Sequence, residues 1–472
     1  LVFVIAALWD AFIAWSAPGV TPPRAAAATP PKPAPAPPPP PAPLTPLHRA
    51  LPWLAGLAAL APFLIWQHEF RQLFWFADDF LLLDQLAEMG LGEWTMRAFA
   101  ENFVPLFKLL WGGAVLGFGG SYPAMLWLLW LTHALNTAVL GRLLQRAGFP
   151  WFAGLATQLV FALTPTNLET LGWSVQWSAV LATSFLLLAL WWHEEHQENL
   201  GAFSWRRHLP LCLLAAASAC SFSRGVLTGA VLALGLLLPA LLSRDWRTAL
   251  PRLPGAILCL VPAIAVAMMI MLQAGGNHQQ MAGHWGDALQ FGAGYFLLNP
   301  GHLLLGDSSL HSGVLLLLAA TKLGVITGAL LLARGRVRQL LLLLLAYDLG
   351  NAALVGIGRY HTGFLASLSS RYQYSSLLAT LPFLTLLLAV ALDRSPLGRP
   401  RPWVAGSLAG SIAVFYLWGW PAELAEFTGW RGTEMRRLIQ APATSDPAVR
   451  VPALEFMHVE RAKALQRAYH LH

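Results

Sequence analysis

Charged residues are scarce in this chain. Only 11% of its 472 residues are Asp, Glu, Lys or Arg, whereas 56% are hydrophobic. A soluble domain usually carries about 25% charged residues, so this chain has too little polar surface to cover a water-soluble body. The mean hydropathy of +0.55 agrees with this. The deficit of charge therefore excludes an ordinary soluble enzyme.

Cysteine is also scarce. Cys212, Cys220 and Cys259 all lie in apolar segments, and no two of them form a CxxC motif. This pattern excludes a disulfide framework and a cysteine-based metal site. One polar segment contains several histidines and an aspartate, but their spacing does not match a tight metal site. We therefore expect neither a bound metal ion nor a cofactor. The residues of that segment are His278, His284, Asp287 and His302.

The apolar residues that are present come in long blocks, such as residues 179–192 and 313–333. Each block is near the roughly 20 residues that a helix needs to cross about 30 Å of hydrocarbon. A spanning segment must satisfy its own backbone, so these blocks are predicted to be helices. The sequence predicts an all-α polytopic membrane protein with about 11–12 transmembrane helices. The core helices are expected at about 50–66, 122–145, 149–165, 170–192, 208–223, 225–242, 254–273, 312–333, 338–357, 374–392 and 402–419.

The two ends of the chain have a different character. Residues 1–17 are apolar, and they begin with Leu, so we interpret them as an extra helix or a misassigned start rather than a cleaved signal peptide. Residues 18–48 are rich in proline and predict a disordered or polyproline linker without a catalytic role. The transmembrane domain is expected over residues 49–420, and residues 421–472 are expected to form a short extracytoplasmic tail.

Basic residues are distributed unevenly over the connections. If the eleven core helices alternate in direction, sixteen Lys and Arg residues fall on one face and six on the other. Basic residues accumulate in cytoplasmic loops, so the face with sixteen is predicted to be cytoplasmic. Membrane topology then explains the net charge of +7, which therefore does not indicate nucleic-acid binding. The longest polar loops, 67–121, 274–311 and 358–373, face outward. We expect any chemistry on the extracytoplasmic side of a bacterial-type cytoplasmic membrane.

The first outward loop carries an acidic pair, Asp78 and Asp79, among four aromatic residues between positions 74 and 80. Adjacent carboxylates repel each other, and an apolar setting opposes ionisation. Both effects raise the pKa of a carboxyl group toward the range useful for a general base. The alternative is a helix cap or a turn at the exit from the membrane.

A second candidate site follows the third core helix. Pro165 ends this helix, and Asn167 and Glu169 then lie at the outer surface before the next one. An acidic residue so close to the membrane core is a functional candidate. The alternative is an N-cap, in which Thr166 or Asn167 caps the next helix and its dipole favours Glu169.

Three arginines lie in outward turns, where the topological reason for basic residues does not apply. Arg224 lies in a tight turn between two apolar helices, where it can pair with an acid or bind a lipid phosphate. Arg359 and Arg371 share one loop with His361 and Tyr372, and such a group suits a phosphate or a sugar. The alternative is that these long side chains reach the lipid headgroups.

The order of the motifs resembles a known family. After the acidic pair come, in sequence, ENFVPLFKLL, LTHALN, LTPTNLETLGW, SFSRG and SRYQYSSLLATLPFL. This order resembles the GT-C superfamily of membrane glycosyltransferases. The likeness is to its protein O-mannosyltransferase-like branch and to the transmembrane O-mannosyltransferases that carry TPR repeats. It covers about residues 50–392. In that family the corresponding stretch reads as a DD motif, an RPL motif, an HxxN helix, HPxxxE, SKE and an RY motif.

The chain departs from the family pattern at several positions. Thr164 replaces the histidine of HPxxxE, although Pro165 and Glu169 remain. The arginine of RPL is missing. Ser223-Arg224-Gly225 stands in place of SKE, so the positive charge is kept and the acid is not. A TPR array is also missing. These departures bear on the substrate class.

The resemblance implies transfer of a sugar from a polyprenyl-phosphate donor to an acceptor hydroxyl on a glycan, lipid or protein at the outer face. Asp78 matches the acid that serves as general base in related enzymes, with Asp79 and Glu169 in support. A set of basic and aromatic residues is then expected at the donor phosphate: Arg224, Arg371 and Tyr372. A second set is expected near the acceptor or the sugar: Asn167, Arg359 and His361.

Two other functions stay open. One is a transporter or flippase of lipid-linked glycans, and the other is an inactive GT-C relative that binds the donor without turnover. A transporter should place ionisable residues near the middle of its helices. Here most charges fall at outer helix ends, with Lys322 as the chief exception. That distribution favours the transferase.

Overall fold

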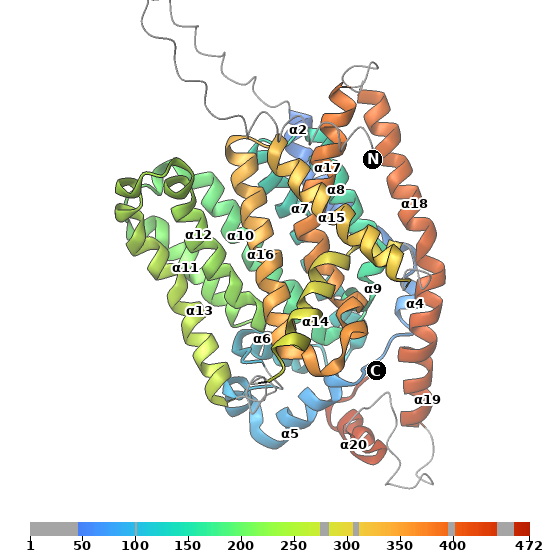
Figure 1. Cartoon of the computed structure of the whole chain (residues 1–472). Coiled ribbons are helices and arrows are strands. Elements are labelled where there is room, and N and C mark those ends of the chain that lie inside the picture. The colour runs from blue at the N-terminus through green and yellow to red at the C-terminus, as the bar shows by residue number, and fades with distance from the viewer. Residues whose placement is uncertain (1–45, 100–101, 274–282, 305–310, 395–401, 441–456) are drawn as a thin grey trace, which may run out of the picture.

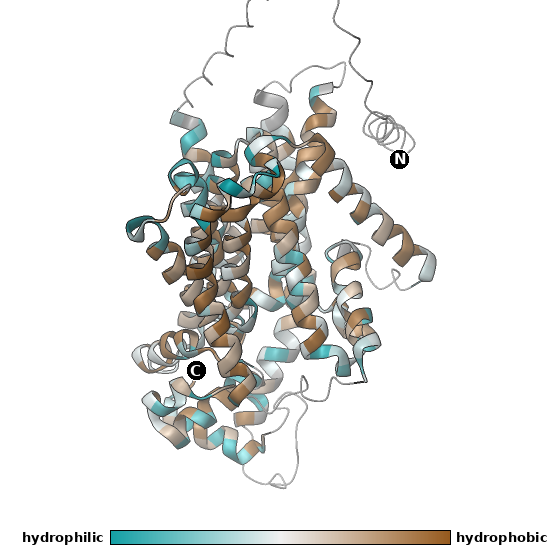
Figure 2. Ribbon diagram, turned by 60° about the vertical axis from the view of Figure 1, so that its left-hand side comes forward, coloured by the Kyte–Doolittle hydropathy of each residue, from teal (hydrophilic) through white to brown (hydrophobic). Residues whose placement is uncertain are grey.

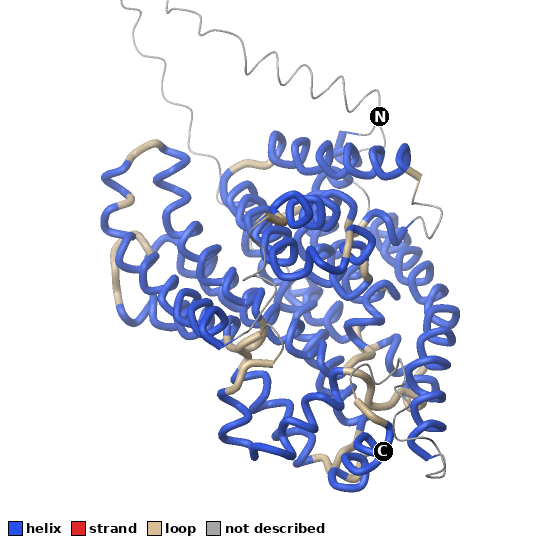
Figure 3. The backbone as a smooth tube through the Cα atoms, turned by 60° about the horizontal axis from the view of Figure 1, so that its bottom comes forward, coloured by secondary structure: helices blue, strands red, loops and turns tan. Residues whose placement is uncertain are grey.

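A computed structural model of the chain describes residues 46–99, 102–273, 283–304, 311–394, 402–440 and 457–472. Over these residues the structure contains helices and no strands; only an isolated bridge joins Phe99 and Asn102 (Figure 3). The predicted all-α fold class is therefore confirmed. The expected extra helix at 1–17, and the linker up to residue 45, lie outside the described residues.

Among the described residues, seven helices are long and apolar enough to cross a membrane. They are α7 (Tyr122–Ala147), α10 (Trp177–His196), α12 (Val226–Ser243), α13 (Leu253–Gln273), α15 (Ser312–Leu332), α16 (Gly335–Arg359) and α17 (Gln373–Arg394). The remaining predicted ranges also contain helices, namely α2 (Pro46–Ala58) with α3 (Ala61–Ile65), α8 (Trp151–Leu163), α11 (Trp205–Ala219) and α18 (Pro402–Thr428). The chain is thus an integral membrane protein.

Helix ends follow from local sequence. Gly148 ends α7 in the left-handed conformation, with φ of 90°, which glycine adopts without steric cost. Thr164 ends α8 in an extended conformation because the ring of Pro165 disfavours the helical conformation of the preceding residue. The short helices η1 (Pro165–Asn167) and α9 (Leu168–Leu171) then turn the chain toward α10.

The segments predicted to face outward gather in one half of the molecule. In Figure 1 the lower half contains α5 (Asp78–Met96), α6 (Pro105–Gly117), α14 (Trp285–Leu298), α19 (Glu434–Gln440) and α20 (Val459–Tyr469). Figure 2 shows hydrophobic residues along the long helices and hydrophilic residues concentrated toward the two ends. This arrangement suits a bundle that crosses a membrane and carries additional helices at one end.

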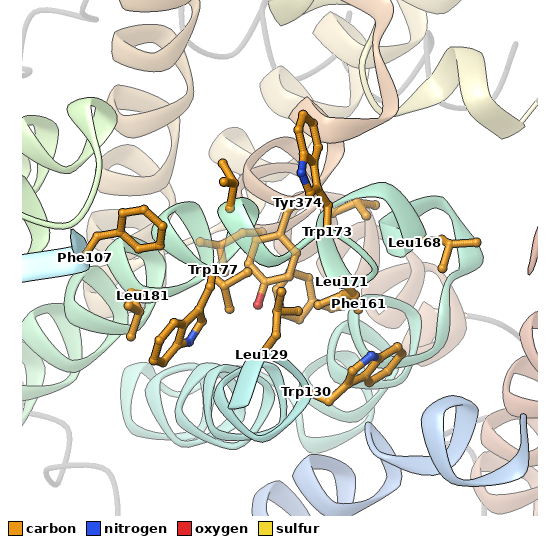
Figure 4. Packing of buried hydrophobic residues seen from close by; sticks show 14 of the residues in the cluster. Phe107, Leu129, Trp130, Phe161, Leu168, Leu171, Trp173, Trp177, Leu181 and Tyr374 are labelled. Atoms are coloured by element: carbon orange, nitrogen blue, oxygen red, sulfur yellow. The ribbon is translucent and has the colours of Figure 1, made fainter. Parts of the chain in front are cut away.

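A tyrosine in the core fixes the N-terminal end of α17. Tyr374 packs on Phe161 with ring centroids 4.9 Å apart, and both lie among large apolar side chains in Figure 4. Its hydroxyl accepts a hydrogen bond from the Asn136 amide at 3.0 Å and pairs with the His133 ring at 3.0 Å. These contacts join α7 to α17, and they position residues 371 and 372 directly beside the core.

The C-terminal segment packs against the helices at this end of the bundle. Helix α18 continues to Thr428, so the boundary expected at residue 420 falls inside it. Gly432 approaches the backbone so closely that a Cβ there would lie 2.1 Å from the carbonyl oxygen of Gln72. The backbone of His472 exchanges hydrogen bonds with Tyr122, at 3.0 Å, and with Gly120, at 3.2 Å. The tail therefore closes over the loop that carries the acidic pair.

Candidate functional site

The acidic pair begins helix α5, and its two members have different environments. Asp79 is fully buried; its carboxylate accepts hydrogen bonds from the Phe76 backbone N–H at 3.0 Å and from the Ser174 hydroxyl at 2.6 Å. Ser174 in turn accepts a hydrogen bond from the Trp111 indole at 3.0 Å. Asp78 is half-buried. Asp79 therefore ties the loop to η2 (Ser174–Gln176), whereas Asp78 stays more accessible.

Burial also sets the ionisation of Asp79. Loss of water raises the pKa of its carboxyl group from 3.8 to about 7, and the neighbouring charge of Asp78 adds to the rise. The hydrogen bonds from Ser174 and Phe76 act in the opposite direction but do not cancel it. The residue before the pair, Ala77, has φ of 43°, which is uncommon for a residue with a side chain. The loop thus contains a carboxyl group, that of Asp79, whose pKa lies near neutral pH. The acidic pair follows Ala77, whose backbone conformation is strained.

Glu169 lies on α9, and three donors surround its carboxylate. It accepts hydrogen bonds from the Ser370 hydroxyl and from the Arg371 backbone N–H, the latter at 2.9 Å. Its other oxygen lies 3.3 Å from the guanidinium of Arg431. The ion-pair partner of Glu169 is therefore Arg431 of the C-terminal segment. Glu169 thereby joins α9 to η12 (Ser370–Tyr372) and to the tail.

Arg431 was not predicted as a site residue. It lies in η13 (Gly429–Thr433), and its guanidinium is 4.4 Å from the Phe427 ring, 4.9 Å from Phe76 and 5.4 Å from Trp173. Phe76 is the residue whose N–H binds Asp79, so Arg431 connects the acidic loop to Glu169. Glu169, Phe76 and Trp173 are all far from Arg431 in the sequence, so no local pattern marks this residue.

Two arginines flank one tyrosine ring. Arg224, in η4 (Ser223–Gly225), is 7% exposed and donates a hydrogen bond to the Ser375 hydroxyl at 3.2 Å. The guanidinium groups of Arg224 and Arg371 lie 5.9 Å and 5.5 Å from the ring of Tyr372. Among the residues that the structure describes, no Asp or Glu side chain forms an ion pair with either arginine. The three residues expected at the donor phosphate are therefore brought together.

The remaining predicted residues make other contacts. Asn167 is fully buried, and its amide donates a hydrogen bond back to the Phe161 carbonyl at 3.0 Å, so it holds a turn together. Arg359 is half-buried at the end of α16, and His361 is exposed in the next turn. The neighbouring Tyr360 stacks on His284 at 5.3 Å, which places this turn against α14.

The contacts form one continuous network at one end of the bundle. It begins at Asp79, passes through Phe76 and Arg431 to Glu169, and continues through the backbone of Arg371 to the two arginines around Tyr372. Within the described ranges, no group of three His, Cys, Asp or Glu side chains is placed to hold a metal ion. His278 lies outside those ranges. The network joins the carboxylates of Asp79 and Glu169 to two arginines without acidic partners at one end of the protein.

Neither a comparison with protein-family models nor a search of curated proteins finds a match to this chain. The resemblance to GT-C glycosyltransferases therefore stays a prediction, and the function is argued from the site itself.

Proposed function

We propose that the protein transfers a sugar from a polyprenyl-phosphate donor to an acceptor hydroxyl at the extracytoplasmic face of the membrane. The observation that carries this proposal is the pair of arginines around Tyr372, which have no carboxylate partner among the described side chains. Their position beside apolar helix ends suits a phosphate that is attached to a lipid chain. Guanidinium groups bind phosphate oxygens through paired, charge-assisted hydrogen bonds.

The proposed reaction uses the acidic loop as its base. The acceptor oxygen attacks the anomeric carbon of the sugar while the bond from that carbon to the phosphate oxygen breaks. Asp78 takes the proton of the acceptor hydroxyl, and polyprenyl phosphate leaves. Arg224 and Arg371 stabilise the negative charge that develops on the leaving phosphate, which is the usual role of preorganised cations.

Asp79 and Glu169 have supporting roles in this proposal. Asp79 holds the loop through Phe76 and Ser174, so it positions Asp78. Glu169 holds the backbone of Arg371 and the side chain of Arg431, so it positions the phosphate-binding turn against the acidic loop. Neither carboxylate needs to contact the substrate.

Binding of sugar-free polyprenyl phosphate to the purified protein in nanodiscs tests the phosphate site. Loss of one charge-assisted partner typically costs about 1.5–3 kcal/mol, so Arg224→Gln or Arg371→Gln should weaken binding by about ten-fold or more. Arg97→Gln is the matched control, because Arg97 is an exposed arginine at the same end of the molecule. Unchanged affinity in both site variants would reject the assignment.

A transporter of lipid-linked glycans is the second candidate, and one observation favours it. Lys322 and Asp348 form an ion pair of 2.9 Å between α15 and α16, with side chains 6% and 3% exposed. Buried ionisable residues inside membrane-spanning helices are typical of transport pathways. A transporter leaves its substrate intact, so release of sugar-free polyprenyl phosphate from the donor distinguishes the transferase from it.

A further inference from the structure

A small cavity lies between the short helix α4 (Gln67–Phe70) and the first turns of α7. Its volume is about 60 Å³. A single water molecule needs roughly 10–15 Å³ of such space, so the cavity admits several waters or one group of the size of a phosphate. Its buried walls are apolar and include Phe63, Phe70 and Leu126. Arg71 is exposed and Trp127 is half-buried, so the cavity opens to the surface.

Two polar side chains, those of Gln67 and Arg71, line this cavity. They are four residues apart, so they lie on the same side of one helical turn. The backbone carbonyl of Arg71 accepts a hydrogen bond from Arg436 at 2.8 Å, which fixes the main chain here. Among the described residues, neither the guanidinium of Arg71 nor the amide of Gln67 forms a hydrogen bond or an ion pair. Both groups are therefore available to a ligand.

Helix α7 indicates the level of the cavity relative to the membrane. It has 26 residues and is therefore about 39 Å long, which exceeds the roughly 30 Å of hydrocarbon. Its ends reach the level of the lipid headgroups, and Pro123 and Trp127 belong to its first turns. Tryptophan is enriched at this level. Helix α18 packs against both α4 and α9, so the cavity lies at the same end of the bundle as Glu169 (Figure 1).

Exposed apolar side chains continue from the cavity toward the middle of the bundle. Leu64 follows Phe63 of the cavity wall and is 52% exposed, and Leu131 lies one turn after Trp127 and is 49% exposed. The rings of Phe63 and Trp127 are 4.7 Å apart, so the two apolar surfaces start from one point. In a membrane such surfaces lie against acyl chains. A ligand with a charged head and apolar chains matches this arrangement.

The charge of the cavity defines the head of this ligand. Arg71 is charged, and no Asp or Glu is among the described residues that line the cavity, so the head is an anion. The phosphate diester of a glycerophospholipid carries one negative charge, which one guanidinium balances. A terminal phosphate carries about 1.5–2 charges, which two arginines balance better. An ammonium headgroup would find no carboxylate in the cavity, whereas an uncharged glycerol headgroup can pair with the amide of Gln67.

We propose that this cavity binds an anionic glycerophospholipid of the surrounding membrane, such as phosphatidylglycerol. Arg71 binds the phosphate diester, Gln67 binds the headgroup, and the acyl chains lie over Leu64 and Leu131. This site is separate from Arg224 and Arg371, and the inference does not depend on the proposed sugar transfer.

Native mass spectrometry of the purified protein in detergent tests the site. The probes are short-chain phosphatidylglycerol, phosphatidylethanolamine with the same chains, and a short polyprenyl phosphate. The wild type should bind phosphatidylglycerol more tightly than phosphatidylethanolamine. Arg71→Gln should weaken binding of phosphatidylglycerol by about ten-fold and leave binding of polyprenyl phosphate unchanged. Arg97→Gln is the control, because Arg97 is an exposed arginine outside the cavity, and it should change neither affinity.

Thermal unfolding supplies a second readout. Because the Arg71 guanidinium makes no hydrogen bond or ion pair with the described residues, Arg71→Gln should keep the melting temperature of the lipid-free protein. A ligand that binds the folded state stabilises it according to its affinity. Added phosphatidylglycerol should therefore raise the melting temperature of the wild type and of Arg97→Gln more than that of Arg71→Gln.

Three results would overturn this inference. The first is equal binding of phosphatidylglycerol and phosphatidylethanolamine by the wild type. The second is an equal loss of phosphatidylglycerol binding in Arg71→Gln and Arg97→Gln, which would indicate attraction by surface charge alone. The third is a loss of polyprenyl phosphate binding in Arg71→Gln as large as that of phosphatidylglycerol, which would make the cavity part of the donor site. If instead the wild type binds phosphatidylglycerol in this cavity but no polyprenyl phosphate, the proposed function fails and this inference stands.

Discussion

The ion pair between Glu169 and Arg431 should couple the C-terminal segment to the rest of the site. The two side chains are 13% and 15% exposed, so most of their surface is removed from water. Removing one partner of a buried pair costs about 3–5 kcal/mol, whereas exposed pairs contribute about 0–1 kcal/mol. We expect about 2–3 kcal/mol for Glu169→Gln. Arg431→Gln should cost more, because it also loses contacts with three aromatic rings.

A double-mutant cycle measures this coupling. Reversible unfolding in mixed micelles is compared for the wild type, Glu169→Gln, Arg431→Gln and the double variant. The double variant should be less destabilised than the sum of the single variants by about 2 kcal/mol. Arg146 and Glu195 supply a control pair, because they are 3.0 Å apart but 45% and 41% exposed. A coupling for Glu169 and Arg431 that is no larger than for the control pair would refute the reasoning.

Two further predictions concern the acidic loop and the topology. Because the folded protein retains a proton on Asp79 up to about pH 7 and the unfolded chain releases it near pH 3.8, the wild-type stability should fall as pH rises from about 4 to 7, by at most about 4 kcal/mol. Asp79→Asn should remove this part of the pH dependence. If the free energy of unfolding of the variant changes with pH as steeply as that of the wild type, this prediction is wrong. For topology, Glu93→Cys should react with an impermeant maleimide from outside and Trp246→Cys only from the cytoplasm; the reverse labelling would invert the assigned sides.

Much of the fold could be predicted from the sequence, because membrane-spanning helices are long and nearly uniform in hydropathy. Each of the eleven predicted ranges contains helix, and α7 begins at Tyr122 as expected. Helices α5, α6 and α14 are different, since they lie in segments predicted as outward loops. Helix α5 is kinked at Gly90, where φ is 71°, and α6 and α14 have only 13 and 14 residues. Such helices are stabilised by packing on neighbours, which a hydropathy pattern does not report.

The site was predictable only in part, for a physical reason that Glu169 illustrates. Its own position follows from Pro165 and the helix end, but its partner Arg431 is 262 residues away in the chain. Nothing local marks that contact, because Phe76 and Trp173, two of the three aromatic residues around Arg431, come from distant segments. Asp348 was also not predicted. It lies in the apolar sequence of α16, and its partner Lys322 is on another helix.

The central claim is that Asp78 acts as the general base in a sugar transfer. The most direct test measures release of sugar-free polyprenyl phosphate from the donor, in membranes that contain the native acceptors. General base catalysis typically contributes 10²–10⁴-fold, so Asp78→Asn should lower turnover by about that factor and leave donor affinity intact. Asp79→Asn should lower it less. Full turnover by Asp78→Asn would contradict the account, and if neither variant changes turnover the transferase itself is excluded.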